Sequence, residues 1–207
     1  MAGSGRSGDL VTSSSEAFCR DYARRMQDAF AAGPIDAIGQ LASALLNALQ
    51  QESHVFIAGN GGSAANAMHL ANDFLYGIGK DFGVGLRVEA LPANASIVTC
   101  LANDMSYDEV FAEQIRLKGR ADDLLLVLSG SGNSPNIVRA IEAAHARKMK
   151  TFAVLGFSGG RCRGSVQCPI HFAVDDMQIS EDLQLMVGHM CMQWIRAQLA
   201  EQGGPGA

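Results

Sequence analysis

The sequence predicts an α/β protein whose doubly wound parallel sheet has five strands, with a helical layer before the first strand. Short apolar runs of strand length alternate with longer segments of helical periodicity from residue 55 onward. The run at residues 124–128 is apolar throughout, as expected for a central parallel strand covered on both faces. Glycine-rich turns follow two of the predicted strands, which is where doubly wound sheets bind their ligands.

Composition and charge exclude several classes of protein. The 207-residue chain is 48% hydrophobic and 18% charged, which is typical of a globular domain. Its net charge of −5 gives no basis for binding nucleic acid. No apolar run reaches the roughly 18 residues of a membrane helix, and the N-terminus lacks the apolar core of a signal peptide. We therefore expect a cytoplasmic protein with neither a membrane nor a nucleic-acid partner.

The cysteines support the same compartment. They are odd in number, scattered, and without the two-residue spacing of a zinc knuckle or redox pair. We interpret all five as reduced thiols of a cytoplasmic protein: Cys19, Cys100, Cys162, Cys168 and Cys191.

The two ends of the chain differ in composition from the rest. Residues 1–14 are rich in glycine and serine and are expected to be disordered, and residues 203–207 are expected to fray. Residues 15–202 are sufficient for one well-buried domain. The first two helices are expected over residues 15–30 and 35–51, separated by a Gly-Pro break.

Strands and helices then alternate along the chain. The pattern predicts strands over residues 55–58, 87–91, 124–128, 151–155 and 170–174. It predicts helices over residues 63–77, 94–102, 107–118, 135–148 and 182–202. Apolar side chains surround the closing helix almost completely, so we expect it to be buried on all sides, in part at a subunit interface.

The turn at residues 59–63, Gly-Asn-Gly-Gly-Ser, lies between a predicted strand and a predicted helix. Free backbone N–H groups and the positive end of a helix dipole meet at such a turn, and a phosphate is its natural occupant. The helix then presents His69 and Asp73, four residues apart on one face. An imidazole and a carboxylate at this spacing can hold one metal ion or share one proton.

A second turn of the same kind, Ser-Gly-Ser-Gly-Asn-Ser at residues 129–134, follows the central strand. Its hydroxyls and the helix N-terminus after it make a phosphate cradle by composition. It is not a Walker loop, because no Gly-Lys-Ser/Thr follows. Since both turns end parallel strands, we expect them at one edge of the sheet.

In this order the motifs resemble those of the sugar isomerase (SIS) domain family, above all its phosphoheptose isomerases. The resemblance rests on the two turns, the His69/Asp73 pair, Asn103-Asp104 and His189, and it covers roughly residues 15–200. It implies a flavodoxin-like single SIS domain over residues 15–202, a homotetramer with active sites between subunits, and often a bound zinc. It also implies conversion of sedoheptulose 7-phosphate to glycero-manno-heptose 7-phosphate.

The resemblance assigns roles position by position. Asp73 becomes the catalytic base and His189 the acid. The implied ligands of zinc, or of another divalent metal, are His69, Asp73, Glu181 and His189. The implied substrate-binding positions are Asn60, Gly61, Gly62, Ser63, Asn103, Asp104, Ser129, Gly130, Ser131, Ser134 and Glu181.

The chain departs from the family at two of these positions. Asp73 stands where the isomerases have Glu, and Glu181 stands where they have Gln. On a continuous helix, Glu181 and His189 lie about 12 Å apart along the axis. Glu181 therefore joins the metal only if it precedes the regular helix.

Other interpretations stay open for the single residues and for the whole chain. Taken singly, His69 and His189 are compatible with packed histidines, Asp73 with a solvated charge, and Glu181 with a helix N-terminus. The chain-level alternatives are a non-catalytic SIS protein that binds phosphosugars or the bacterial replication initiator, a phosphosugar sensor, and a dinucleotide-binding domain. The retained acid and histidine argue against the first. The absence of a DNA-binding domain argues against the second, and the absence of an acid about 20 residues after the first turn argues against the third.

Overall fold

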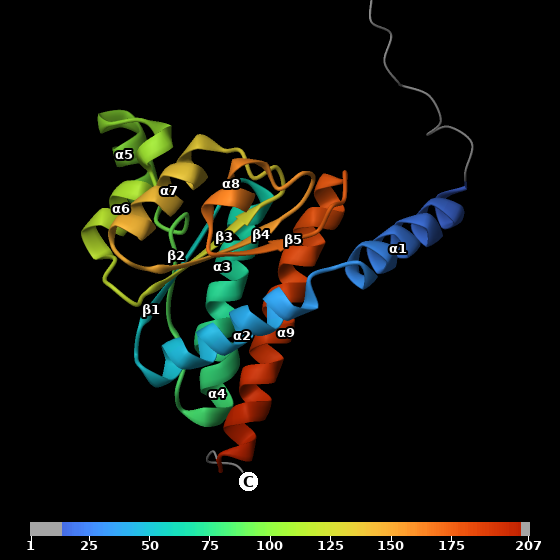
Figure 1. The fold of residues 1–207 in the computed structure, drawn as a ribbon, viewed down its shortest axis with the longest axis horizontal. Coiled ribbons are helices and arrows are strands. Elements are labelled where there is room, and N and C mark those ends of the chain that lie inside the picture. Colours follow the sequence, from blue (N-terminus) through green and yellow to red (C-terminus); the bar gives the residue numbers. More distant parts are fainter. Residues whose placement is uncertain (1–13, 204–207) are drawn as a thin grey trace, which may run out of the picture.

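The computed structural model describes residues 14–203, with a five-stranded sheet at the centre (Figure 1). The strands are β1 (His54–Gly59), β2 (Arg87–Ala90), β3 (Leu124–Ser129), β4 (Lys150–Leu155) and β5 (Cys168–His171). All neighbours pair in parallel, in the order β2-β1-β3-β4-β5. The predicted doubly wound, five-stranded sheet is therefore confirmed. Residues 1–13 and 204–207 lie outside the described residues, and with them nearly all of the segment expected to be disordered.

Helices cover both faces of the sheet (Figure 1). One face carries α2 (Ile35–Gln50), α3 (Gly62–Asn72), α4 (Ile78–Phe82) and α9 (Met177–Glu201), and the other carries α6 (Ala112–Lys118), α7 (Pro135–Ala146) and α8 (Gly160–Ser165). Side chains of β3 alternate between the two cores: Leu124 and Leu126 join the first, and Leu125 and Val127 join the second. Burial on both faces explains why this strand is apolar throughout.

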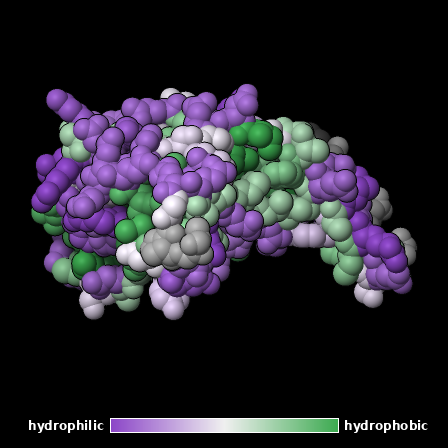
Figure 2. All heavy atoms as spheres, turned by 90° about the horizontal axis from the view of Figure 1, so that it is seen from below, coloured by the Kyte–Doolittle hydropathy of each residue, from purple (hydrophilic) through white to green (hydrophobic). Residues whose placement is uncertain are grey.

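Helix α1 (Ser15–Ala31) stands away from the body as an arm (Figures 1 and 2), and none of its residues is buried. Two side-chain contacts hold it against the start of α9. The Tyr22 hydroxyl donates to Asp182 Oδ2, and Arg25 Nη1 pairs with Asp176 Oδ2, both at 2.5 Å. Burial and the bond to Asp182 together raise the pKa of Tyr22 to about 12.

Several predicted boundaries were wrong, and three of the differences have a local reason. The closing helix begins at Met177 rather than at residue 182, because Asp176 caps it by accepting from the Ile179 N–H. The predicted helix over residues 63–77 is regular only through α3 and continues as a π-helical turn, η1 (Asp73–Gly77). The last strand is β5 rather than residues 170–174. It pairs with β4 up to the pair Leu155–His171, so the two strands end together.

Smaller elements also differ from the prediction. The expected helix over residues 107–118 is a 3-10 turn, η2 (Tyr107–Glu109), followed by α6. Helix α5 (Ala95–Asp104) runs two residues past its predicted end and buries none of its side chains. The short helix α8 was not predicted, because two left-handed glycines at its start read as a loop.

Helix α9 buries one face within the chain, through Ile179, Leu183, Val187, Cys191 and Ile195, whereas Trp194 is 39% exposed. The expected burial on all sides is therefore not reached in one chain. No single helix among residues 14–203 is both long and apolar enough to cross a membrane. Helices α1 and α2 satisfy that test only together, as a pair bent by 75°, and by length and composition alone.

Candidate functional site

The strand order fixes where a ligand can bind. Strands β1 and β3 are neighbours, and the chain leaves them toward opposite sides of the sheet, to β2 and to β4. In doubly wound sheets, such a switch point opens a crevice beyond the carboxyl ends of the strands. The two turns predicted to bind phosphate follow β1 and β3, so the fold brings them together there.

Two positions of the turn after β1 require glycine. A Cβ on Gly59 would lie 2.5 Å from the carbonyl oxygen of Ser63. This oxygen is a backbone atom and cannot easily move away. Gly61 has φ of +57°, in the left-handed region that side chains disfavour. These two residues let the chain pass from β1 into α3 within a single tight turn.

A cavity of about 280 Å³ lies between the two turns and the first turns of α9. It is lined by Asn60, Gly61, Gly62, Ser63, Leu128, Ser129, Gly130, Ser131, Ser134, Met177 and Glu181. Ser129 Oγ accepts from the Gly132 N–H at 3.0 Å, and Ser131 Oγ accepts from the Asn133 N–H at 3.3 Å, so the cradle is ordered by its own hydroxyls. Ser134 precedes α7 without a side-chain capping bond, which leaves its hydroxyl available to a ligand.

Asn103 and Asp104 are the two predicted substrate-binding residues that do not line this cavity. Both are exposed at the end of α5, where Asn103 Nδ2 donates to Asp104 Oδ1 at 2.8 Å. This bond, and a second one from the Cys100 thiol, lower the pKa of Asp104. Helix α5 lies at the periphery of the fold (Figure 1), so a single chain does not bring these two residues to the predicted site.

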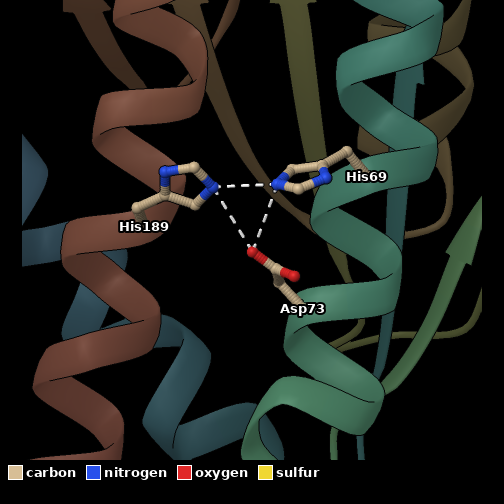
Figure 3. Close-up of side chains that lie close together, drawn as sticks. All are labelled: His69, Asp73 and His189. Atoms are coloured by element: carbon tan, nitrogen blue, oxygen red, sulfur yellow. Dashed lines mark hydrogen bonds and ion pairs between the residues drawn. The ribbon is translucent and has the colours of Figure 1, made fainter.

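Three of the four predicted metal ligands meet between α3 and α9 (Figure 3). His69 and Asp73 come from α3 and the π turn after it, and His189 faces them from α9. The two histidine Nε2 atoms lie 2.9 Å apart, and Asp73 Oδ2 lies 3.4 Å from His69 Nε2 and 3.3 Å from His189 Nε2. The carboxylate is 16% exposed, and the His69 and His189 side chains are 47% and 40% exposed, so the cluster is open on its histidine side.

This triangle of atoms fits a metal ion. Tetrahedral zinc binds imidazole nitrogen and carboxylate oxygen at about 2.0–2.2 Å, which places neighbouring ligand atoms about 3.3–3.5 Å apart. The two separations that involve Asp73 have this value, and the His69–His189 separation is shorter. Two imidazoles and one carboxylate also leave a fourth position for water or substrate, as in catalytic zinc sites. The residues present therefore fit zinc or a similar divalent cation.

Glu181 is not part of this cluster. It lies inside α9, eight residues before His189 and about 12 Å from it along the helix axis. Its carboxylate lies instead at the cavity, where a Cβ on Gly62 would be 2.4 Å from both carboxylate oxygens. The early start of α9 thus separates Glu181 from the other three predicted metal ligands within one chain, while its place in the cavity wall agrees with a substrate-binding residue.

The sequence did not single out Gln184, whose side-chain amide supports Ser63 in the cavity wall. Gln184 is 1% exposed; it donates through Nε2 to Ser63 Oγ and accepts from Asn66 Nδ2, both at 3.0 Å. A glutamine among the apolar residues of a buried helix face was the available signal, because a buried amide needs partners.

Asn60 is held by two further residues that the sequence did not single out. The Tyr107 hydroxyl donates to Asn60 Oδ1 at 3.0 Å, and the amides of Asn60 and Asn136 exchange two hydrogen bonds of 2.9 Å. No local pattern marks either residue, because their role depends on how η2 and α7 pack beside the turn after β1.

Comparison with known proteins agrees with the family resemblance of the sequence motifs. The SIS domain profile matches residues 17–156. A phosphoheptose isomerase of Desulfovibrio desulfuricans is 33% identical over 185 residues, which cover 89% of this chain and 85% of that protein. The phosphoheptose isomerase of Thiobacillus denitrificans is 44% identical over a shorter match of 123 residues, which covers 59% of this chain and 62% of that protein. The solved structure of a phosphoheptose isomerase from Neisseria gonorrhoeae has a TM-score of 0.80 at 29% identity and covers 88% of this chain and 96% of that chain.

Proposed function

Since the chain belongs to the SIS domain family, we propose that it is a phosphosugar isomerase that converts sedoheptulose 7-phosphate to D-glycero-D-manno-heptose 7-phosphate through an enediol. One observation carries the proposal. A phosphate cradle and an acid–base cluster lie along the same two helices, α3 and α9. A protein that only bound phosphosugars, or only bound another protein, would have no need of the acid–base cluster.

The distance between the phosphate cradle and the acid–base cluster supports a substrate as long as a heptose 7-phosphate. His69 lies seven residues after Gly62 on α3, which is about 10 Å along the axis. An extended chain advances about 1.2 Å per bond, so the eight bonds from C1 to phosphorus in a heptose 7-phosphate also span about 10 Å. A pentose 5-phosphate is two bonds shorter, and its carbonyl carbon would fall short of the cluster when its phosphate is in the cradle.

The residues of the cluster can perform the proton transfers. Phosphate bound by the serine turn orients the carbon chain from the end remote from the reaction. Asp73 takes a proton from C1, beside the C2 carbonyl, while His189 donates a proton to the carbonyl oxygen, which gives the enediol. Asp73 then returns its proton to C2, and His189 recovers one from the C1 hydroxyl. An aldehyde at C1 results, and both residues regain their starting state.

We also propose that the cluster holds zinc through His69, Asp73 and His189. When bound, zinc would supply Lewis-acid stabilisation of the oxygen that becomes negatively charged, in place of the proton from His189, whose Nε2 would then be occupied as a ligand. Asp73 contributes only Oδ2 to the triangle, which leaves its second carboxylate oxygen for the proton.

A cytoplasmic homotetramer with active sites between subunits is the remaining part of the proposal. Apolar side chains left exposed in one chain support it. Ile35 is 55% exposed and borders, with Trp194, a mostly apolar cavity of about 850 Å³ between α2 and α9. Leu75 and Tyr76, two and three residues after Asp73, are 53% and 65% exposed. Light scattering should give about four times the chain mass of 21.8 kDa. The five free cysteines fit a reducing compartment.

The test of the activity is turnover of sedoheptulose 7-phosphate by zinc-reconstituted protein in heavy water. The expected product carries solvent deuterium at C2 in a share of turnovers, because the proton held by the base exchanges with solvent. Ribose 5-phosphate should react more slowly. Binding of the heptose phosphate without turnover or exchange would favour the non-catalytic alternative.

A further inference from the structure

Asn60 and Asn136 form a reciprocal amide pair across the switch point. Each side-chain Nδ2 donates to the other residue's Oδ1, at 2.9 Å in both directions. Asn60 lies in the turn after β1, and Asn136 is the second residue of α7, which follows the turn after β3. The pair therefore links the turn after β1 to the start of α7, beyond Gly59 and Leu128, the last residues that pair β1 with β3.

Because Asn136 is buried, its side-chain amide depends on the hydrogen bonds to Asn60. Asn136 is 1% exposed, and a buried amide that loses its partner keeps the full cost of its desolvation. An apolar residue at the same place in α7 would pack without that requirement. The pair is thus a specific connection between the turns and not a general contribution to packing.

The third partner comes from outside both turns. The Tyr107 hydroxyl, at the start of η2, donates to the same Asn60 Oδ1 at 3.0 Å. Tyr107 follows α5, which buries none of its side chains, so this bond anchors an otherwise exposed segment to the cavity wall.

These bonds use most of the hydrogen-bonding capacity of Asn60. Its Oδ1 accepts from both Asn136 and Tyr107, and its Nδ2 donates once to Asn136. An amide nitrogen carries two hydrogens, so one N–H is left, and within residues 14–203 it has no hydrogen-bond acceptor. Asn60 lines the cavity, where the other polar groups are serine hydroxyls and the Glu181 carboxylate.

We propose that Asn136 and Tyr107 are positioning residues that fix the Asn60 amide, so that its remaining N–H donates to an oxygen of the sugar phosphate in the cavity. This inference rests on the proposed function, which places a sugar phosphate there. Asn136 and Tyr107 themselves need not touch the ligand. They act by restricting Asn60 to one orientation and by joining the two turns.

A double-mutant cycle tests this proposal, because residues that act as a unit give non-additive effects. The variants are Asn60→Ala, Asn136→Ala and the double variant, and the measured quantity is the calorimetric Kd for sedoheptulose 7-phosphate. Each single variant should bind about tenfold more weakly, and the double variant should bind no more weakly than Asn60→Ala. An unchanged Kd in Asn136→Ala, or multiplied losses in the double variant, would overturn the positioning role.

Two further variants separate positioning from folding. Tyr107→Phe, which removes the hydroxyl that donates to Asn60, should raise KM with little change in melting temperature. Thr151→Val removes a fully buried hydroxyl at the opposite edge of the sheet. It should lower the melting temperature and leave Kd within about twofold of wild type.

The same cycle measured by denaturant unfolding separates this inference from the proposed function. Coupled shifts in the unfolding midpoint are expected for Asn60 and Asn136 without any ligand, and additive shifts would overturn the connection between the turns. If the midpoints are coupled but wild-type protein binds no sugar phosphate, the proposed function fails and the connection between the turns stands.

Discussion

His69 and His189 are 120 positions apart in the chain, yet their rings meet edge to face with the Nε2 atoms 2.9 Å apart. The neighbouring residues explain this contact. Gly188 lies against Leu70, and a Cβ at Gly188 would be 2.2 Å from Leu70 Cδ2. The missing side chain therefore lets α9 approach α3 closely enough for the two histidines and Asp73 to share one small volume.

The first prediction concerns metal binding. His69→Ala and His189→Ala should each lose zinc affinity by more than the ~10–100-fold that removal of an outer-shell partner costs, and should lose isomerase activity with it. His145→Ala is a matched control, because this histidine bonds to Thr151 at the other end of the sheet. Calorimetric titration of zinc checks the result. Full zinc occupancy in the double histidine variant would place the metal elsewhere, and full activity of metal-free wild type would remove zinc from the mechanism.

The second prediction concerns the approach of the two helices. Gly188→Ala should force α9 away from α3, because the new methyl group meets the buried Leu70 side chain. We expect weaker zinc binding and a loss of about 1–3 kcal/mol in unfolding free energy. The combined variant Gly188→Ala/Leu70→Ala should recover part of the zinc affinity, since it removes the clash. Gly164→Ala, where a Cβ meets nothing within 4 Å, should leave zinc affinity unchanged.

The third prediction concerns the phosphate cradle. Ser131→Glu places a carboxylate beside the expected phosphate and removes a hydroxyl that orders the turn through the Asn133 N–H. It should abolish sugar-phosphate binding, because like charges repel most strongly where water is excluded. Melting temperature should stay close to that of wild type, as it should in the control Ser165→Glu on α8. Unchanged sugar-phosphate affinity by calorimetry would contradict the assignment of the cradle.

The sequence was informative where function depends on local pattern. The turns after β1 and β3 are marked by glycine and serine within a few residues, and a four-residue spacing alone puts His69 and Asp73 on one side of a helix. These features depend on residues that are close together in the chain, so they can be predicted from sequence neighbours alone.

Features that depend on tertiary packing were less predictable. The Ser-Glu-Asp stretch at residues 180–182 looked like a helix start, and only the structure places the true cap at Asp176 and so moves Glu181 from the metal to the cavity. The pairing of Asn60 with Asn136 requires β1 and β3 to be neighbours. Asn103 and Asp104 lie on α5, which buries none of its side chains, and they do not line the cavity.

The fourth prediction concerns the start of α9 at low pH. Burial alone would raise the pKa of Asp176, but hydrogen bonds from the Ile179 N–H and from Arg25 lower it overall. Since the folded-state pKa is below the unfolded value of about 3.9, this group contributes stability above that pH and loses it as pH falls through the folded-state pKa. Asp176→Ala should therefore cost about 1–2 kcal/mol at pH 7, and its difference from wild type should be smaller at an acidic pH well below the unfolded-state pKa. Melting curves at both pH values check this, with Arg20→Met as a control for an exposed ion pair of little effect.

The last prediction concerns Glu181, whose carboxylate lies against Gly62 in the wall of the cavity. Because Glu181 is two helical turns from His189, Glu181→Gln should leave zinc affinity unchanged. It should keep or raise isomerase activity, since a neutral amide removes negative charge near the bound phosphate. Gly62→Ala should displace the flexible carboxylate into the cavity and raise KM, and Gly62→Ala/Glu181→Ala should restore it. Gly59→Ala gives the contrast, because its methyl group meets backbone and should disrupt the turn in either background. Loss of zinc in Glu181→Gln would return this residue to the metal site and contradict the present assignment.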